Sequence, residues 1–389
     1  MGIFSMIAAI AAIALLSLAI STDVTTKCCL PDDSVPSFRW KGGTPQFLDN
    51  NCNECDLLVN ISSSIQQDNR TINVLSFGDS YELGFCKARP SGNNNSVFQF
   101  LQYNNDTKYI FTLCSRYEES INYMVRRMYG QIGEPKQVWE SSDQSSLHVI
   151  NEMGRYFATT TNEHQKTPNT RSRNDKLVIE KIDAVVFGSF LWDLKHWHSS
   201  WCRQILREAS NRDENTTNRM YIGLCSHVKI GNTNVTSDSA QPLDVETIVQ
   251  SWGRMTLPWC DAATLLNWQE TYLREVHALL AAFPHSVLFL RTQPISCGVF
   301  LANEHCPGPM NAFILKVWAT LQHLVHQSAS GATLGRRVRL IALHELFQAP
   351  NDNGVDHFSD DNIHLTEDGA KVYRGYVLRV LDEYRRSII

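Results

Sequence analysis

Short apolar runs rich in β-branched residues recur along the chain, and amphipathic stripes lie between several of them. The runs are Ile72 to Phe77, Gln137 to Glu140, Ala184 to Phe187, Ser286 to Leu290 and Val338 to Leu343. Runs of this kind are typical of strands buried on both faces of a parallel sheet. Their alternation with helical patterns predicts an α/β fold with an open, doubly wound parallel sheet. The ligand crevice of such a sheet lies beyond the carboxyl ends of its strands.

Two long stripes repeat their apolar residues at intervals of three and four, as amphipathic helices do. Their members are Leu265, Trp268, Tyr272, Val276, Leu279 and Phe283, and then Met310, Phe313, Ile314, Val317, Trp318, Leu321, Leu324 and Val325. A third stripe, from Val372 to Tyr384, predicts a terminal helix. We interpret all three stripes as faces that pack on the core.

The N-terminal segment indicates export. Residues Ile7 to Ile20 form one apolar run, and Ser17-Leu18-Ala19 offers small residues at the two positions that a signal peptidase reads. The run from Ile3 to Ile20 is also long enough to span a bilayer as an uncleaved anchor. We therefore expect residues 1–21 to be a signal peptide or a type II signal anchor. The rest of the chain is then secreted, or lumenal in the secretory pathway or Golgi.

Sequons and cysteines agree with export. The N-x-[ST] sequons, which accept glycans in the secretory pathway, are at Asn60, Asn69, Asn94, Asn105, Asn215 and Asn234. The 11 cysteines fit an oxidising compartment, with several disulfides and one thiol left over. Cys28-Cys29 and Cys52-x-x-Cys55 lack the further ligands that a zinc site needs, so we interpret them as disulfide partners.

Composition narrows the domain organisation and the partners. Residues 22–70 carry cysteine, asparagine and proline without a clear period, which predicts an irregular, disulfide-held extension before an α/β domain at residues 71–389. The formal net charge of -5 argues against binding to nucleic acid through bulk phosphate attraction.

The first apolar run leads directly into Gly78-Asp79-Ser80. Glycine permits a tight strand-to-helix turn, and a serine after it presents its hydroxyl at the top of the sheet, beside backbone N–H groups that face an incoming oxyanion. Ser80 is therefore a candidate nucleophile. The alternative is that Ser80 only caps the following helix.

A serine nucleophile needs a base, and the base needs an orienting carboxylate. Asp361 and His364 supply both in a polar, acidic loop before the terminal helix, which we expect Thr366 to cap. A second D-x-x-H copy, Asp193 to His196, is surrounded by tryptophan and leucine and predicts a packed helix start or a wall beside the substrate. His196-x-His198 has a metal-like spacing, but such pairs are usually structural.

These segments together resemble the GDSL/SGNH hydrolase superfamily, in which a flavodoxin-like sheet carries Ser, Asp and His in that chain order. The resemblance covers roughly Ile72 to Ile389, which is most of the chain. Two further segments resemble the PC-esterase branch, whose members modify O-acetyl groups on polysaccharides or sialic acids. They are Phe187 to Leu194, similar to a G-x-x-x-W segment, and Leu290 to Pro294, similar to a strand that ends in R-T-x-P.

The resemblance implies a serine esterase that removes O-acyl groups, above all acetyl, from a glycan or a similar substrate. Ser80 would be the nucleophile, Asp361 the orienting carboxylate and His364 the base and later the acid. Ser80 and Gly188 would contribute to the oxyanion hole, and Arg291 to oxyanion or substrate binding. No metal or organic cofactor is needed. An O-acetyltransferase with the same triad and a non-catalytic glycan-binding protein remain the alternatives.

Two parts of the family pattern have no unique counterpart. Typical members carry a glycine after the second strand, for which Gly130, Gly133 and Gly154 compete. They also carry an Asn after the third strand, and no Asn occurs between Gly188 and Asp193.

Overall fold

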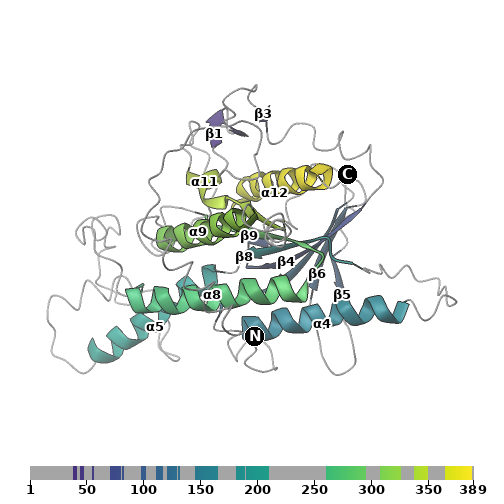
Figure 1. Ribbon diagram of the computed structural model, residues 1–389. Coiled ribbons are helices and arrows are strands. Elements are labelled where there is room, and N and C mark those ends of the chain that lie inside the picture. The colour runs from purple at the N-terminus through teal and green to yellow at the C-terminus, as the bar shows by residue number, and fades with distance from the viewer. Residues whose placement is uncertain are drawn as a thin grey trace.

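A computed structural model describes sixteen segments of the chain, which include every element named below (Figure 1). They are residues 38–41, 44–47, 55–56, 71–79, 81–82, 98–101, 111–116, 121–128, 130–131, 145–164, 181–188, 190–209, 260–294, 307–325, 337–348 and 364–387. The sheet lies between two layers of helices, with α4 and α8 below it in this view and α9 and α12 above it.

Seven strands form the main sheet, in the order β10-β9-β8-β4-β7-β6-β5. They are β4 (Ile72–Gly78), β5 (Phe98–Leu101), β6 (Phe111–Arg116), β7 (Ile121–Arg127), β8 (Ala184–Gly188), β9 (Val287–Arg291) and β10 (Val338–Ile341). The five strands from β10 to β7 run parallel, whereas β6 and β5 continue the sheet antiparallel. The expected α/β fold with a parallel sheet is confirmed.

The order of the parallel strands is compatible with a flavodoxin-like fold. Read from β7, these strands follow the sequence order 2-1-3-4-5, which is the flavodoxin-like arrangement. The central strand β4 pairs with β7 on one side and with β8 on the other. The sequence reverses direction across the sheet at β4, so its carboxyl end lies at the switch point where such folds bind ligands.

The second parallel strand was not recognised in the sequence. The run predicted as a strand at Gln137 to Glu140 lies outside the described residues, and the observed neighbour of β4 is β7. Asn122 and Arg126 interrupt the apolar pattern of β7, and both side chains are only partly buried. Asn122 donates a hydrogen bond to the Asn73 side chain at 2.8 Å, a contact between neighbouring strands that hydropathy does not reveal.

Six helices cover the sheet in the described part of the chain. They are α4 (Ser146–His164), α5 (Leu191–Ala209), α8 (Ala262–Ala282), α9 (Pro307–Val325), α11 (Leu343–Gln348) and α12 (Glu367–Ser387). The three predicted stripes correspond to α8, α9 and α12 and are confirmed. Asp261 caps α8 by accepting the backbone N–H of Thr264 at 2.7 Å, which satisfies one of the free donors at the helix start.

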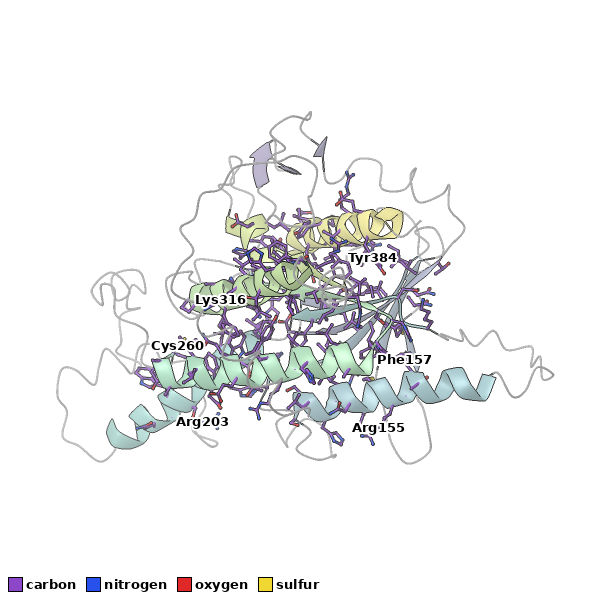
Figure 2. The ribbon with its side chains drawn as sticks, viewed as in Figure 1. Arg155, Phe157, Arg203, Cys260, Lys316 and Tyr384 are labelled. Atoms are coloured by element: carbon purple, nitrogen blue, oxygen red, sulfur yellow. The ribbon has the colours of Figure 1, made fainter. Side chains whose placement is uncertain are left out.

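Side chains fill the space between the sheet and both helix layers (Figure 2). Phe157 of α4 packs on Phe283 with ring centroids 6.4 Å apart, while Tyr384 of α12 packs on Phe289 of β9 at 5.9 Å. The charged side chains of Arg155 and Lys316 are exposed on the outer sides of their helices. Burial on both faces therefore explains the continuous apolar runs of the central strands.

A second, smaller sheet lies within the segment that was expected to be irregular. It contains β1 (Phe38–Lys41), β2 (Thr44–Phe47) and β3 (Cys55–Asp56), paired antiparallel in that order. The expectation of irregular structure was wrong for these residues, because strands this short are defined by their pairing rather than by an apolar run. The cysteines expected to hold the extension, apart from Cys55, lie outside the described residues.

Cys202 of α5 and Cys260, just before α8, are both disulfide-bonded. Both side chains are buried. Within the described ranges no helix is long and apolar enough to cross a bilayer, and residues 1–21 lie outside those ranges.

Candidate active site

The central strand ends where the sequence places the candidate nucleophile. Gly78 is the last residue of β4, the buried Asp79 follows it, and helical backbone begins at Tyr81. A Cβ at Gly78 would lie 1.9 Å from Cγ of Glu82, so only glycine permits this close approach. Ser80 itself lies outside the described residues. Its neighbours on both sides are buried.

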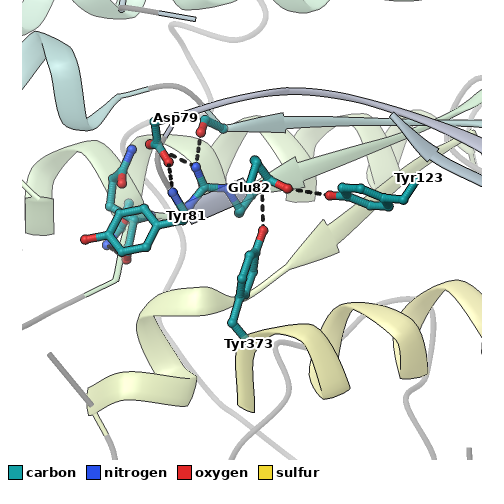
Figure 3. A network of polar contacts seen from close by, with 9 residues as sticks. Asp79, Tyr81, Glu82, Tyr123 and Tyr373 are labelled. Carbon is teal, nitrogen blue, oxygen red and sulfur yellow. Dashed lines mark hydrogen bonds and ion pairs between the residues drawn. The ribbon is translucent and has the colours of Figure 1, made fainter. Parts of the chain in front are cut away.

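Arg291, the last residue of β9, pairs with Asp79 and Glu82 of this turn, which Figure 3 shows within a network of polar contacts. Its Nη2 lies 3.1 Å from Oδ2 of Asp79, and its Nε lies 3.1 Å from Oε1 of Glu82. Nη2 also donates to the backbone carbonyl of Gly188, and the guanidinium lies 5.6 Å from the centre of the Tyr81 ring. Arg291, Asp79 and Glu82 are all 0% exposed. Because buried charges are costly when unpaired, these partners are needed to keep the guanidinium inside.

Two phenols complete the surroundings of Glu82. Tyr123 of β7 donates its hydroxyl to Oε2 of Glu82, and Tyr373 of α12 donates to Oε1. Burial, and after it the charge of Glu82, raises the pKa of both phenols well above the usual range, so both remain protonated donors. Burial also raises the pKa of the Asp79 carboxyl, although the Arg291 guanidinium acts in the opposite direction.

The next two residues after β9 fasten the strand end to other elements. Oγ1 of Thr292 lies 2.9 Å from Nδ1 of His344 and accepts the backbone N–H of His344 at 3.1 Å. With its amide oxygen turned toward α5, Gln293 accepts the backbone N–H groups of Phe190 at 2.9 Å and Leu191 at 3.2 Å. The R-T-Q segment thus joins the ends of β4, β8 and β10 to the end of β9.

The structure places two of the predicted binding residues within these contacts. Gly188 ends β8 beside the end of β4, and Arg291 bonds its carbonyl. A contact of either residue with an oxyanion or a substrate stays a prediction. What is observed is that the buried Arg291 side chain pairs with Asp79, Glu82 and the carbonyl of Gly188, whereas its Nη1 has no hydrogen-bond partner among the described residues.

A tight turn after β7 lies at the same edge of the sheet. Gly130 has a φ of 76°, and a Cβ on it would lie 2.3 Å from Oδ1 of Asp193. The same oxygen accepts the backbone N–H of Gln131 at 2.7 Å. Among the three competing glycines, Gly130 therefore follows the second parallel strand, Gly154 lies inside α4, and Gly133 lies outside the described residues.

Asp193 therefore stabilises the turn after β7 through this hydrogen bond. It is buried in the first turn of α5, and its partner in the second D-x-x-H copy, His196, lies one turn further along the helix. The expectation that this copy belongs to a packed helix start is confirmed.

The Gly130 turn also contacts a second pair of buried carboxyl groups, those of Asp193 and Glu275. Nε2 of Gln131 lies 3.1 Å from the carbonyl of Trp268 and 3.3 Å from Oε2 of Glu275 on α8. Burial raises the pKa of Glu275 to about 7 and that of Asp193 well above its usual value. Both groups therefore hold a proton more tightly in the folded chain than in the unfolded chain.

His364 is exposed just before α12, and its predicted partner Asp361 lies outside the described residues. Oγ1 of Thr366 accepts the backbone N–H of Gly369 at 3.1 Å, which confirms the predicted helix cap. This cap fixes the direction in which the chain enters α12. His364 is thus held within one turn of an ordered helix start.

The described part of the chain contains no group of three or more histidine, cysteine, aspartate or glutamate side chains arranged to hold a metal ion. Nε2 of His198, which the sequence paired with His196 at a metal-like spacing, lies 3.4 Å from Sγ of Cys202.

Comparisons with protein-family models, curated proteins and solved structures found no match. Membership of the SGNH superfamily therefore stays a prediction that rests on the residues of this chain. The geometry adds a buried ionic network on both sides of position 80.

Sequence reasoning missed three members of this network. Glu82, Tyr123 and Tyr373 have no motif of their own, and each side chain meets the others only through the fold. One signal was present, because Asp79 and Glu82 are three residues apart, a spacing that places side chains on one face of a helical turn. An arginine at the end of a buried strand then needs carboxylate partners.

Proposed function

We propose that this chain is a serine esterase of the SGNH type, secreted or lumenal, that removes O-acyl groups from a glycan or a similar substrate. Acetyl is the preferred acyl group in this proposal. Ser80 is the nucleophile, His364 is the general base and then the acid, and Asp361 orients His364.

The contact between Glu82 and Tyr373 carries the proposal. Glu82 is two residues after Ser80, and Tyr373 is about two turns into the helix that begins just after His364. This hydrogen bond ties the turn that bears the candidate nucleophile to the helix that follows the candidate base. A Ser-His arrangement requires such proximity between segments that are far apart in the sequence.

The chemistry follows from these roles. The Ser80 hydroxyl attacks the acyl carbonyl while Nε2 of His364 takes the hydroxyl proton, and the oxyanion is held by the Ser80 backbone N–H with a contribution near Gly188. Collapse of the tetrahedral intermediate releases the sugar hydroxyl, which receives the proton from His364. Water, deprotonated by His364, then attacks the acyl-enzyme to form a second tetrahedral intermediate. Its collapse breaks the bond to Oγ of Ser80, which takes the proton back from His364, and releases the carboxylic acid. Every step uses side chains and backbone groups of the chain itself.

The test incubates the purified protein with an O-acetylated glycan, with and without a competing sugar acceptor. Release of free acetate that is lost in Ser80→Ala and kept in the matched control Ser199→Ala, on α5, supports the proposal. Acetyl transfer to the acceptor would instead make the protein an O-acetyltransferase with the same triad. Glycan binding without either product would contradict catalysis and favour a glycan-binding protein.

A fluorophosphonate probe gives a second readout that does not depend on the substrate. Such probes form a covalent bond with an activated serine, so the wild type is expected to be labelled and Ser80→Ala is not. Equal labelling of both proteins would rule out Ser80 as the nucleophile.

A further inference from the structure

Arg291 contacts the chain on both sides of Ser80. On one side its Nη2 lies 3.1 Å from Oδ2 of Asp79, and on the other its Nε lies 3.1 Å from Oε1 of Glu82. A single side chain from β9 thus binds Asp79, which precedes position 80, and Glu82, which follows it by two residues.

Asp79 connects these contacts to the backbone of Tyr81. While Oδ2 of Asp79 lies 3.1 Å from Nη2 of Arg291, its Oδ1 accepts the backbone N–H of Tyr81 at 3.0 Å. The carboxylate therefore joins residue 79 to the backbone of residue 81, and Arg291 fixes the orientation of that carboxylate.

Arg291 also connects the turn to the neighbouring strand. Its Nη2 donates to the carbonyl of Gly188 at the end of β8, so the ends of β4, β8 and β9 meet at one guanidinium. The planar fork of arginine offers several donors in fixed directions, which a lysine ammonium does not. The contacts therefore depend on arginine and not on positive charge alone.

We infer that Arg291 is a positioning residue, which acts on catalysis by holding the Asp79–Glu82 turn and the Ser80 backbone N–H in the orientation that receives the oxyanion. This inference rests on the proposed function. It differs from a role in substrate binding, because the side chain of Arg291 is 0% exposed and its charge is opposed by two buried carboxylates. Its loss should therefore lower kcat and the rate of covalent labelling while leaving KM nearly unchanged.

The test compares Arg291→Lys with a matched control at the other end of the same strands. Arg337 precedes β10 and donates to the carbonyls of Phe283 at 2.7 Å and Ser286 at 3.2 Å, so Arg337→Lys also removes arginine contacts to the fold. Both variants are expected to lower the melting temperature. Only Arg291→Lys is expected to slow fluorophosphonate labelling of Ser80 and ester hydrolysis, by about tenfold or more, since small displacements of catalytic groups cost that much.

Glu82→Gln provides a second route if Arg291→Lys does not fold. It keeps the shape and one of the two oxygens that accept from the tyrosines, but it removes the charge that pairs with Arg291. Its control is Glu345→Gln on α11, where the carboxylate is partly exposed. We expect slower labelling in Glu82→Gln and wild-type labelling in Glu345→Gln.

Two kinetic results would overturn the inference. The first is a folded Arg291→Lys labelled at the wild-type rate, and the second is a raised KM with unchanged kcat, which would indicate substrate contact instead.

If the wild type itself is not labelled, the proposed function fails. Hydrogen exchange then decides whether Arg291 still orders the turn: faster exchange at residues 79–82 in Arg291→Lys than in Arg337→Lys supports ordering, and equal exchange refutes it.

Discussion

Glu275 shows how far a single buried side chain departs from its behaviour in water. Its carboxyl group lies on α8 against Gln131, and burial raises its pKa from 4.5 to about 7. The folded state therefore binds this proton more tightly than the unfolded state does. Folding is disfavoured by this group when the pH rises from about 4.5 through 7, and the penalty is complete above pH 7.

Glu275→Gln should remove this penalty while keeping an acceptor for Gln131. At pH 8 the variant is expected to be more stable than the wild type by about 3 kcal/mol, an order-of-magnitude value from the shift of the pKa. Near pH 4.5 the difference should vanish. Thermal or denaturant unfolding of both proteins at the two pH values measures it, and a difference that does not depend on pH would contradict the assignment.

The catalytic base is also decided at the level of single residues, because the chain has two D-x-x-H copies. Asp193 is occupied by the Gln131 backbone N–H, whereas His364 precedes the helix whose Tyr373 reaches Glu82. We expect His364→Ala to lower kcat by about three orders of magnitude or more. His196→Ala should mainly change KM or stability.

Kinetics of acetyl-ester hydrolysis by the two histidine variants, each checked for folding by circular dichroism, test this expectation. Loss of turnover in a folded His196→Ala, together with normal turnover in His364→Ala, would move the active site to the third strand.

At the scale of elements, the end of β9 organises its neighbours through side chains rather than backbone pairing. Arg291 reaches the turn after β4, Thr292 reaches α11, and Gln293 reaches the start of α5. All three are 0% exposed. The carboxyl edge of the sheet is therefore stabilised by buried polar contacts, which are costly to leave unsatisfied.

Gln293→Met tests how much the fold depends on these buried polar contacts. Methionine has a similar size but accepts no strong hydrogen bond, so the backbone N–H groups of Phe190 and Leu191 would lose their acceptor. We expect the free energy of unfolding to fall by about 1–3 kcal/mol. The control is Gln204→Met. Gln204 is exposed on α5, the helix that Gln293 caps, so this substitution should change stability by less than about 0.5 kcal/mol. Equal effects of the two substitutions in denaturant unfolding would refute the capping role.

At the scale of the whole molecule, disulfides stabilise the helix layer below the sheet. Cys202 on α5 and Cys260 before α8 are both disulfide-bonded, and α5 and α8 lie on the same side of the sheet (Figure 1). The 11 cysteines and the sequons of the chain led us to expect an oxidising compartment.

Reductant should therefore lower the melting temperature sharply, since a structural disulfide typically contributes about 2–4 kcal/mol. Protein expressed through the secretory pathway should also lose mass on deglycosylation. The measurements are calorimetry with and without reductant, and mass spectrometry before and after glycosidase treatment. An unchanged melting curve, or an unchanged mass, would contradict the expectation of export.

The sequence alone was sufficient for the elements whose residues share one environment. The strands at Ile72, Ala184, Ser286 and Val338 are buried on both faces along most of their length, so apolar residues dominate their runs, and the α8, α9 and α12 stripes follow from one buried face. The strand β7 was not recognised, although its run, with Asn122 and Arg126 among apolar residues, resembles the run of its neighbour β4 with Asn73. The strands of the small N-terminal sheet were not predicted from the sequence, because pairing between short segments defines them rather than an apolar run.

Only the tertiary structure decided the partners of polar side chains. Glu82, Tyr123, Tyr373 and Arg291 come from four different elements, and their contacts span up to 291 positions of sequence. The energy of each contact depends on burial and on the approach of distant groups, neither of which a local pattern contains. Likewise, Asp193 and Asp361 have the same local motif, and only the fold commits Asp193 to the Gly130 turn. Local periodicity reports which face of an element is buried, whereas charge pairing in the interior is a property of the assembled fold.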